Sequence, residues 1–224
     1  MARFVRPTYN TVDVFAAACA AQRINGEYLK TDDITYYDDG HEYTHKVNRV
    51  ANKTLVHQFL KGELGMTLED HEMGDKVMQY CRGLTFKLLT DKRLSDFEQT
   101  MLTIVEKSTT DSNYDIAVVA SLPASYERSV ARAAQNIRLR ENAGCIQAPE
   151  GSKVEMDIEV VRCNYSNEWG VFYVTAIADA GVVFFAQQNK IEVDSKIRIK
   201  GKVKRHKEDR TQLSQDRKST RLNS

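Results

Sequence analysis

The hydrophobic and polar positions along the chain follow two different periods, which change near residues 144–151. Beyond that point, hydrophobic residues alternate with charged ones through residues 153–161 and again through residues 196–206. A period of two places the hydrophobic side chains on one face and is typical of a half-buried β-strand. We therefore predict a strand in each of these two segments.

Two further segments and the first residues of a last strand complete the β-rich part. Residues 169–178 and 182–187 are rich in aromatic and β-branched residues and flank a tight turn from Asp179 to Gly181, which predicts a hairpin. Residues 211–215 begin a fifth strand. Five short strands with a hairpin between the second and the third fit a small closed barrel, above all the OB-fold.

Residues 1–142 have a helical period instead. Hydrophobic residues at spacings of three and four predict helices over residues 14–22 and 44–60, after Thr67, after Ser95, and from Pro123 to about Asn142. Thr67 with Asp70, and Ser95 with Glu98, have the spacing of a capping box, in which a hydroxyl and a carboxylate each accept a backbone N–H.

These patterns predict an α+β protein with a helical domain at 1–142, a linker at 143–152 and a five-stranded OB-like β-barrel at 153–215. The last strand is expected to be truncated. Residues 216–224 are those that a common sequencing adapter encodes when it is translated in frame. We therefore interpret them as an artefactual tail and leave them out of the fold prediction.

Composition limits the classes of function. The formal charge of +1 means that any attraction to nucleic acid must be local. No apolar run reaches the roughly 18 residues of a membrane span. The four cysteines form no CxxC pair, so we expect reduced thiols, a cytoplasmic location (the host cell's, if the protein is viral), no metal and no cofactor.

We expect no enzymatic activity. The helical part contains no Gly-rich phosphate loop, no HExxH and no GxSxG motif. Cys81 lies on an apolar helical face, where a cysteine is typically part of the core. Glu155, Asp157 and Glu159 are aligned on the first strand, but catalytic carboxylates need burial or a shared metal to shift their pKa values.

The polar face of residues 196–206 carries a row of cations. At about 3.3 Å per residue these side chains recur every 6–7 Å, close to the phosphate spacing of a nucleic-acid strand. Hairpin aromatics would add a surface for base stacking. The candidate nucleic-acid-binding residues are Trp169, Phe172, Phe184, Arg198, Lys200, Lys202, Lys204, Arg205 and His206. The acids of the first strand could instead neutralise the row, because the first strand of an OB-fold neighbours the fourth.

Several short segments carry a family resemblance: Gly151-Ser-Lys-Val-Glu155, Trp169-Gly-Val-Phe172, Val183-Phe-Phe-Ala186, and above all Gly201-Lys-Val-Lys-Arg-His206 followed by Thr211-Gln-Leu213. Together they resemble an OB-like C-terminal module of bacteriophage and plasmid-borne proteins of uncertain role. The resemblance covers under a third of the chain, and the turn at residues 207–210 is short for the family. It implies a viral or mobile-element protein with a nucleic-acid-binding type of barrel.

We therefore expect a phage-type, non-enzymatic accessory protein that binds single-stranded DNA or RNA in replication or recombination. Bases would stack on the hairpin aromatics, and cations of the fourth strand would contact phosphates. The alternative is a protein–protein adaptor whose barrel docks a replication or host protein. The near-zero net charge and the acidic first strand favour that alternative.

Overall fold

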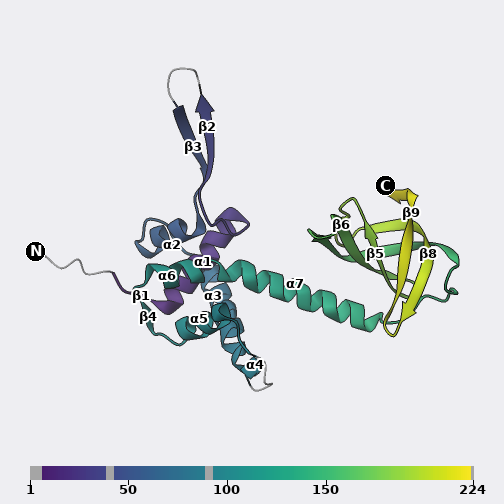
Figure 1. The fold of residues 1–224 in the computed structure, drawn as a ribbon. Helices are drawn as coiled ribbons and strands as arrows, with labels where there is room; N and C mark the ends of the chain where they lie inside the picture. The colour runs from purple at the N-terminus through teal and green to yellow at the C-terminus, as the bar shows by residue number, and fades with distance from the viewer. Residues whose placement is uncertain (1–6, 39–42, 89–92, 223–224) are drawn as a thin grey trace, which may run out of the picture. The chain divides into compact units, whose positions relative to one another are not determined.

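The computed structural model describes residues 7–38, 43–88 and 93–222 (Figure 1). The chain forms two compact units, Met1–Ser129 and Val130–Ser224, which we name the helical unit and the barrel unit. Helices dominate the first and a five-stranded sheet the second, which confirms the α+β class. Within the described ranges, no helix is both long enough and apolar enough to cross a membrane.

The central helix of the helical unit is α1 (Thr11–Asn25), which is rich in alanine and buried from Val14 to Gln22. It packs against α2 (Asn52–Leu60) and α3 (Leu68–Gly83). A Cβ added at Gly74 of α3 would lie 3.0 Å from the backbone nitrogen of Ala16. The small residues of both helices therefore permit a close approach that larger side chains would prevent.

The remaining elements of this unit are short, apart from the last helix. Besides a hairpin described below, they are α4 (Thr85–Leu88), α5 (Asp96–Val105), α6 (Asn113–Val119), α7 (Leu122–Glu141), and the paired strands β1 (Tyr9–Asn10) and β4 (Thr109–Thr110). Both predicted capping boxes are present, at the starts of α3 and α5. The units divide within α7, between Ser129 and Val130, whereas the sequence places the boundary at residues 143–152.

The predicted single helix over residues 44–60 is wrong. β2 (Asp33–Asp38) and β3 (Tyr43–Arg49) form an antiparallel hairpin that projects from the helices, and α2 begins only at Asn52 (Figure 1). An isolated two-stranded hairpin is marginally stable in water. Its position must therefore be fixed by contacts at its base.

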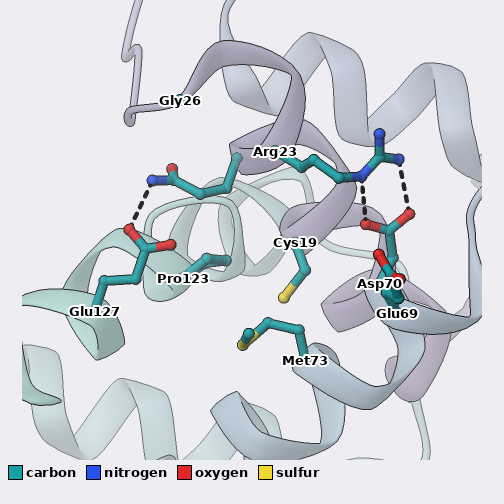
Figure 2. A pocket seen from close by; sticks show the side chains of 9 residues that line it. Cys19, Arg23, Gly26, Glu69, Asp70, Met73, Pro123 and Glu127 are labelled. Carbon is teal, nitrogen blue, oxygen red and sulfur yellow. Dashed lines mark hydrogen bonds and ion pairs between the residues drawn. The ribbon is translucent and has the colours of Figure 1, made fainter.

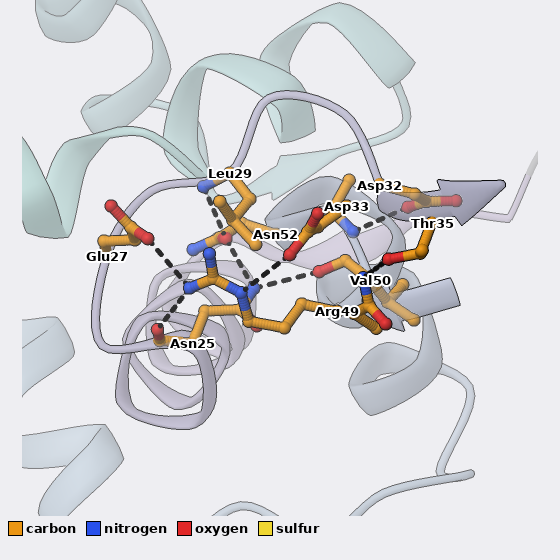
Figure 3. Close-up of polar contacts among 11 residues, drawn as sticks. Asn25, Glu27, Leu29, Asp32, Asp33, Thr35, Arg49, Val50 and Asn52 are labelled. Carbon is orange, nitrogen blue, oxygen red and sulfur yellow. Dashed lines mark hydrogen bonds and ion pairs between the residues drawn. The ribbon is translucent and has the colours of Figure 1, made fainter. Parts of the chain in front are cut away.

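Figure 3 shows these contacts at the base of the hairpin. Asn52, which is fully buried, accepts hydrogen bonds at Oδ1 from the Asn25 side chain (2.8 Å) and the Leu29 backbone N–H (2.9 Å). Arg49 lies 2.8 Å from Glu27 Oε1. These partners lie more than 20 positions apart in sequence, so the local hydrophobic period carried no sign of them.

The strands of the barrel unit pair in the order β5-β6-β7-β9-β8, and β8 also pairs with β5, so the barrel closes. They are β5 (Lys153–Ser166), β6 (Val171–Ala178), β7 (Gly181–Gln187), β8 (Lys196–Lys207) and β9 (Arg210–Leu222). In the described part of the barrel, β7 and β9 pair in parallel and the other strand pairs are antiparallel. The core inside the barrel includes Val160, Val174, Phe185, Ile199 and Val203.

Residues 144–152 of the predicted linker at 143–152 lie along the barrel instead. The Gly144 carbonyl accepts a hydrogen bond from the Val182 N–H (3.0 Å), and Ile146 is buried in the barrel core. A Cβ added at Gly181 would lie 2.5 Å from the Gly144 oxygen. Glycine at 181 therefore allows this segment to approach β7, and the segment belongs to the barrel unit.

The last strand is longer than the sequence predicts. We expected it to stop at Gln215, but its backbone pairs with β8 as far as Leu222, which lies opposite Ile197. Without that pairing, the first residues of β8 would have unpaired backbone N–H and C=O groups along one edge. An extended segment can form hydrogen bonds with these groups through its own backbone, whatever side chains it carries. Residues 223–224 of the predicted tail lie outside the described residues.

Candidate functional site

The cation row of β8 faces outward, as its alternation predicts. Ile197, Ile199, Gly201 and Val203 are buried on the inner face. The residues that alternate with them are exposed: Lys196, Arg198, Lys200, Lys202 and Lys204.

Two of these cations are paired with carboxylates of β5. Arg198 Nε lies 3.1 Å from Asp157 Oδ1, and Lys200 Nζ lies 3.0 Å from Glu155 Oε2. The strand register places each pair directly opposite across the β5–β8 ladder. Because all four side chains are about half exposed, each pair contributes no more than about 1 kcal/mol to stability. Each pair nevertheless cancels a positive charge that a phosphate would otherwise meet.

The third acid of β5, Glu159, is held by α7. Arg138 Nη2 lies 2.7 Å from Glu159 Oε1, and Arg138 Nη1 lies 2.6 Å from Asp194 Oδ1. All three residues belong to the barrel unit. The hydrogen bond to Asp194 and the charges of both carboxylates raise the pKa of Arg138. Lys196, which lies opposite Glu159 in the register, has no ion pair with a described residue.

Lys202 lies directly opposite Lys153, and two like charges in that position destabilise a strand pair. Among the residues whose side chains the structure describes, which leave out those of residues 215–222, Lys153, Lys202 and Lys204 have no ion-pair partner. A surface hollow of about 610 Å³ adjoins the facing lysines and is lined by Lys153, Val154, Glu155, Lys200, Gly201, Lys202 and Ser214. An anion bound there would relieve the repulsion.

Arg205 and His206 have internal partners. Arg205 is exposed, and its Nε donates to Gln212 Oε1 at 2.7 Å. The His206 ring is fixed between Ala148 O, 2.8 Å from Nε2, and Thr211 Oγ1, 2.9 Å from Nδ1. Because a carbonyl only accepts, the neutral ring carries its proton on Nε2 and accepts the Thr211 hydroxyl at Nδ1. The structure therefore assigns the His206 ring to a clasp between two segments of the barrel unit, not to an open surface.

The aromatic candidates fall in different surroundings. Trp169 is 66% exposed, in the turn between β5 and β6. Phe172 has the same parity as Val174 of the core and packs on Tyr165, with ring centroids 4.9 Å apart. Of these two candidates, Trp169 is the one that presents its ring to solvent.

Phe184, the remaining aromatic candidate, stacks on Tyr173, which is not among the predicted site residues. Their ring centroids lie 5.6 Å apart with an interplanar angle of 14°. Phe184 also lines a hollow of about 200 Å³ together with Lys207, Arg210 and Gln212. Tyr173 could have been found by parity, because Val174 and Ala176 are hydrophobic and place residue 173 on the outer face.

The helical unit contains two buried thiols. Burial raises the pKa of Cys81 to about 12. Burial, followed by the negative charges of Asp70 and Glu127, raises the pKa of Cys19 to about 12 as well. Both thiols are therefore protonated at neutral pH and are poor nucleophiles. In the part of the chain that the structure describes, no group of three or more His, Cys, Asp or Glu residues is placed to hold a metal ion.

Comparison with known proteins found no family model, no curated protein and no solved structure that matches this chain. The resemblance of residues 151–215 to the OB-like phage module therefore stays a prediction.

Proposed function

We propose that the barrel unit is an OB-like module that binds single-stranded nucleic acid, and that the protein is a non-enzymatic accessory factor in phage replication or recombination, acting in the host cytoplasm. The proposal is supported by a closed five-stranded barrel with a hairpin between its second and third strands. OB-folds bind oligonucleotides on this hairpin and on the neighbouring loops.

One observation carries the proposal. The stacked pair Tyr173–Phe184 forms an aromatic platform on the outer face of β6 and β7, beside a hollow lined by Lys207 and Arg210. Aromatic rings accept bases of any sequence by stacking, and adjacent cations contact the phosphates. This combination suits single strands, whose bases are free to leave a helical stack.

The ion pairs divide the predicted cations into two groups. Arg198 and Lys200 are neutralised by carboxylates, whereas Lys202 and Lys204 have no ion-pair partner among the described residues. We therefore assign phosphate contacts to Lys202 and Lys204, and to Lys207 beside Phe184, because Arg210 Nε lies 3.2 Å from Asp209 Oδ1. The exposed ring of Trp169 lies in the first interstrand turn and offers one more stacking position.

The test is a titration of a fluorescein-labelled oligothymidylate with the full chain, followed by fluorescence anisotropy. Stacking contributes about 1–3 kcal/mol per base, so Phe184→Ala is expected to weaken binding about five-fold or more. Phe97→Ala, at a 43% exposed ring in the helical unit, is the matched control and should leave affinity unchanged. Absence of binding at low salt, or equal effects of the two variants, would contradict the proposal.

The second candidate is a protein–protein adaptor that docks a replication or host protein through the barrel. The observation in its favour is the pairing of Arg198 with Asp157 and of Lys200 with Glu155, which leaves that flank of the barrel charge-balanced. A partner protein that stays bound to the purified full chain after nuclease treatment, together with no affinity for the oligothymidylate, would favour the adaptor.

A further inference from the structure

The helical unit contains a hollow of about 320 Å³ at the junction of α1, α3 and the start of α7. It is lined by Cys19, Gln22, Arg23, Gly26, Glu69, Asp70, Met73, Pro123 and Glu127. Figure 2 shows the Arg23–Asp70 pair on one side, Glu127 on the other, and the sulfur atoms of Cys19 and Met73 between them. The volume lies at the lower end of the range for small-molecule sites.

The Arg23–Asp70 pair is fully engaged and closes one side of this hollow. Arg23 donates from Nε and Nη2 to the two oxygens of Asp70, both at 2.9 Å. The Asp70 side chain is 3% exposed and also accepts from the Thr67 backbone N–H at 2.8 Å. The carboxylate of Asp70 is therefore committed to the protein itself.

The opposite side is incomplete. Gln22 is 6% exposed, and its Nε2 donates to Glu127 Oε2 at 3.1 Å. A carboxylate only accepts hydrogen bonds, so this contact fixes the orientation of the amide. It leaves Gln22 Oε1 buried without a partner in the part of the chain that the structure describes. Buried polar atoms in proteins are nearly always hydrogen-bonded, so this unpaired acceptor calls for a donor from outside the chain.

The electrostatics of the hollow favour a cation. Three carboxylates, those of Glu69, Asp70 and Glu127, line it against the single guanidinium of Arg23. The negative charges of Asp70 and Glu127 also contribute to the raised pKa of the Cys19 thiol, after burial. Phosphate groups would meet repulsion here, so nucleic acid is not the ligand that this chemistry suits.

We propose that this hollow binds a protonated amine carried on an alkyl stem. The ammonium group donates to the Glu127 carboxylate and to the unpaired amide oxygen of Gln22, while the methylene groups contact Cys19, Met73 and Pro123. This chemistry is shared by free polyamines and by the lysine side chain of a partner protein. It does not depend on nucleic-acid binding by the barrel unit.

The probe is n-butylammonium chloride, added to the full chain with ¹³C-labelled methionine methyl groups. Met73 reports on the hollow, and its signal is identified by its disappearance in Met73→Leu. n-Butanol and sodium butyrate also contain four carbon atoms and lack the positive charge. We expect the Met73 methyl signal to shift with butylammonium and not with the two analogues. An equal shift with butanol or butyrate would overturn the proposal.

Two variants test the polar contacts. Glu127→Gln removes the charge and keeps the shape, and it should weaken butylammonium binding about five-fold, as for a partly exposed ion pair. Gln22→Met removes the amide oxygen and should weaken binding as well. Glu106→Gln, outside the hollow, is the matched control and should bind like the wild type. Wild-type affinity in Glu127→Gln would refute the assignment.

Spermidine and an Nα-acetyl-lysine amide distinguish the two sources of the amine. Tighter binding of spermidine identifies a free polyamine, because its second and third amines reach the other carboxylates. Equal or tighter binding of the lysine derivative identifies a partner's side chain. If neither compound shifts the Met73 methyl signal, the proposed class of ligand is wrong.

Discussion

The division of the β8 cations into paired and unpaired residues leads to a quantitative prediction. Lys202→Thr with Lys204→Thr removes two cations that have no ion-pair partner among the described residues. Glu155→Thr with Lys200→Thr removes one ion pair and leaves the net charge unchanged. Threonine is used because its β-branched side chain suits a strand.

The expected magnitude follows from counterion release. Each phosphate contact to a single strand contributes about 0.7 to the slope of log affinity against log salt. Loss of two contacts therefore lowers the slope by about 1.4. Between about 50 and about 200 mM salt, the wild type should lose about seven-fold more affinity than the Lys202/Lys204 variant. The Glu155/Lys200 variant should keep the wild-type slope.

Fluorescence anisotropy with a labelled oligothymidylate at four salt concentrations measures both slopes. Circular dichroism checks that the variants are folded, and the Glu155/Lys200 pair is exposed enough that its removal should cost no more than about 1 kcal/mol. The reasoning fails if the Glu155/Lys200 variant loses as much slope as the Lys202/Lys204 variant. That result would mean that the paired lysine contacts phosphate despite its carboxylate.

Three further predictions concern the protein itself. Thr211→Val breaks the clasp with His206 and should lower the free energy of unfolding by about 1–3 kcal/mol in calorimetry, whereas Thr211→Ser should not. Burial alone would raise the pKa of Asp70, but hydrogen bonds from Arg23 and Thr67 lower it below its usual value. The wild type should therefore be more stable than Asp70→Asn at pH 7, and this difference in the free energy of unfolding should disappear as the pH falls below about 4. A difference that stays constant with pH would contradict this. In a reaction with iodoacetamide at pH 8 followed by mass spectrometry, Cys145 should be labelled well before Cys81, because Cys81 is buried and the pKa of its thiol is about 12. Early labelling of Cys81 would refute its assignment to the core.

The sequence alone determined the features that depend on near neighbours. Alternation fixed which face of residues 196–206 is buried, because successive side chains of a strand point to opposite sides. The capping boxes at Thr67 and Ser95 were predictable because their partners lie three residues away. The hydrophobic residues Val47 and Val50 have the spacing of a helix with Leu55 and Phe59, which is why the sequence predicts a helix from residue 44. Residues 43–49 are a strand because they pair with β2 and because Arg49 contacts Glu27, and neither contact leaves a local hydrophobic pattern.

The tertiary structure alone decided what the outward-facing groups meet. Arg198 donates a hydrogen bond to Asp157, which lies 41 positions away in the sequence. The His206 ring is hydrogen-bonded to the Ala148 carbonyl, which lies 58 positions away. Strand register and barrel closure determine which cation forms an ion pair with a carboxylate and whether the His206 ring is held by hydrogen bonds. These long-range contacts leave no local pattern in the sequence. The sequence therefore determined that a row of cations faces outward from the barrel, and only the fold decided which of them lack a carboxylate partner.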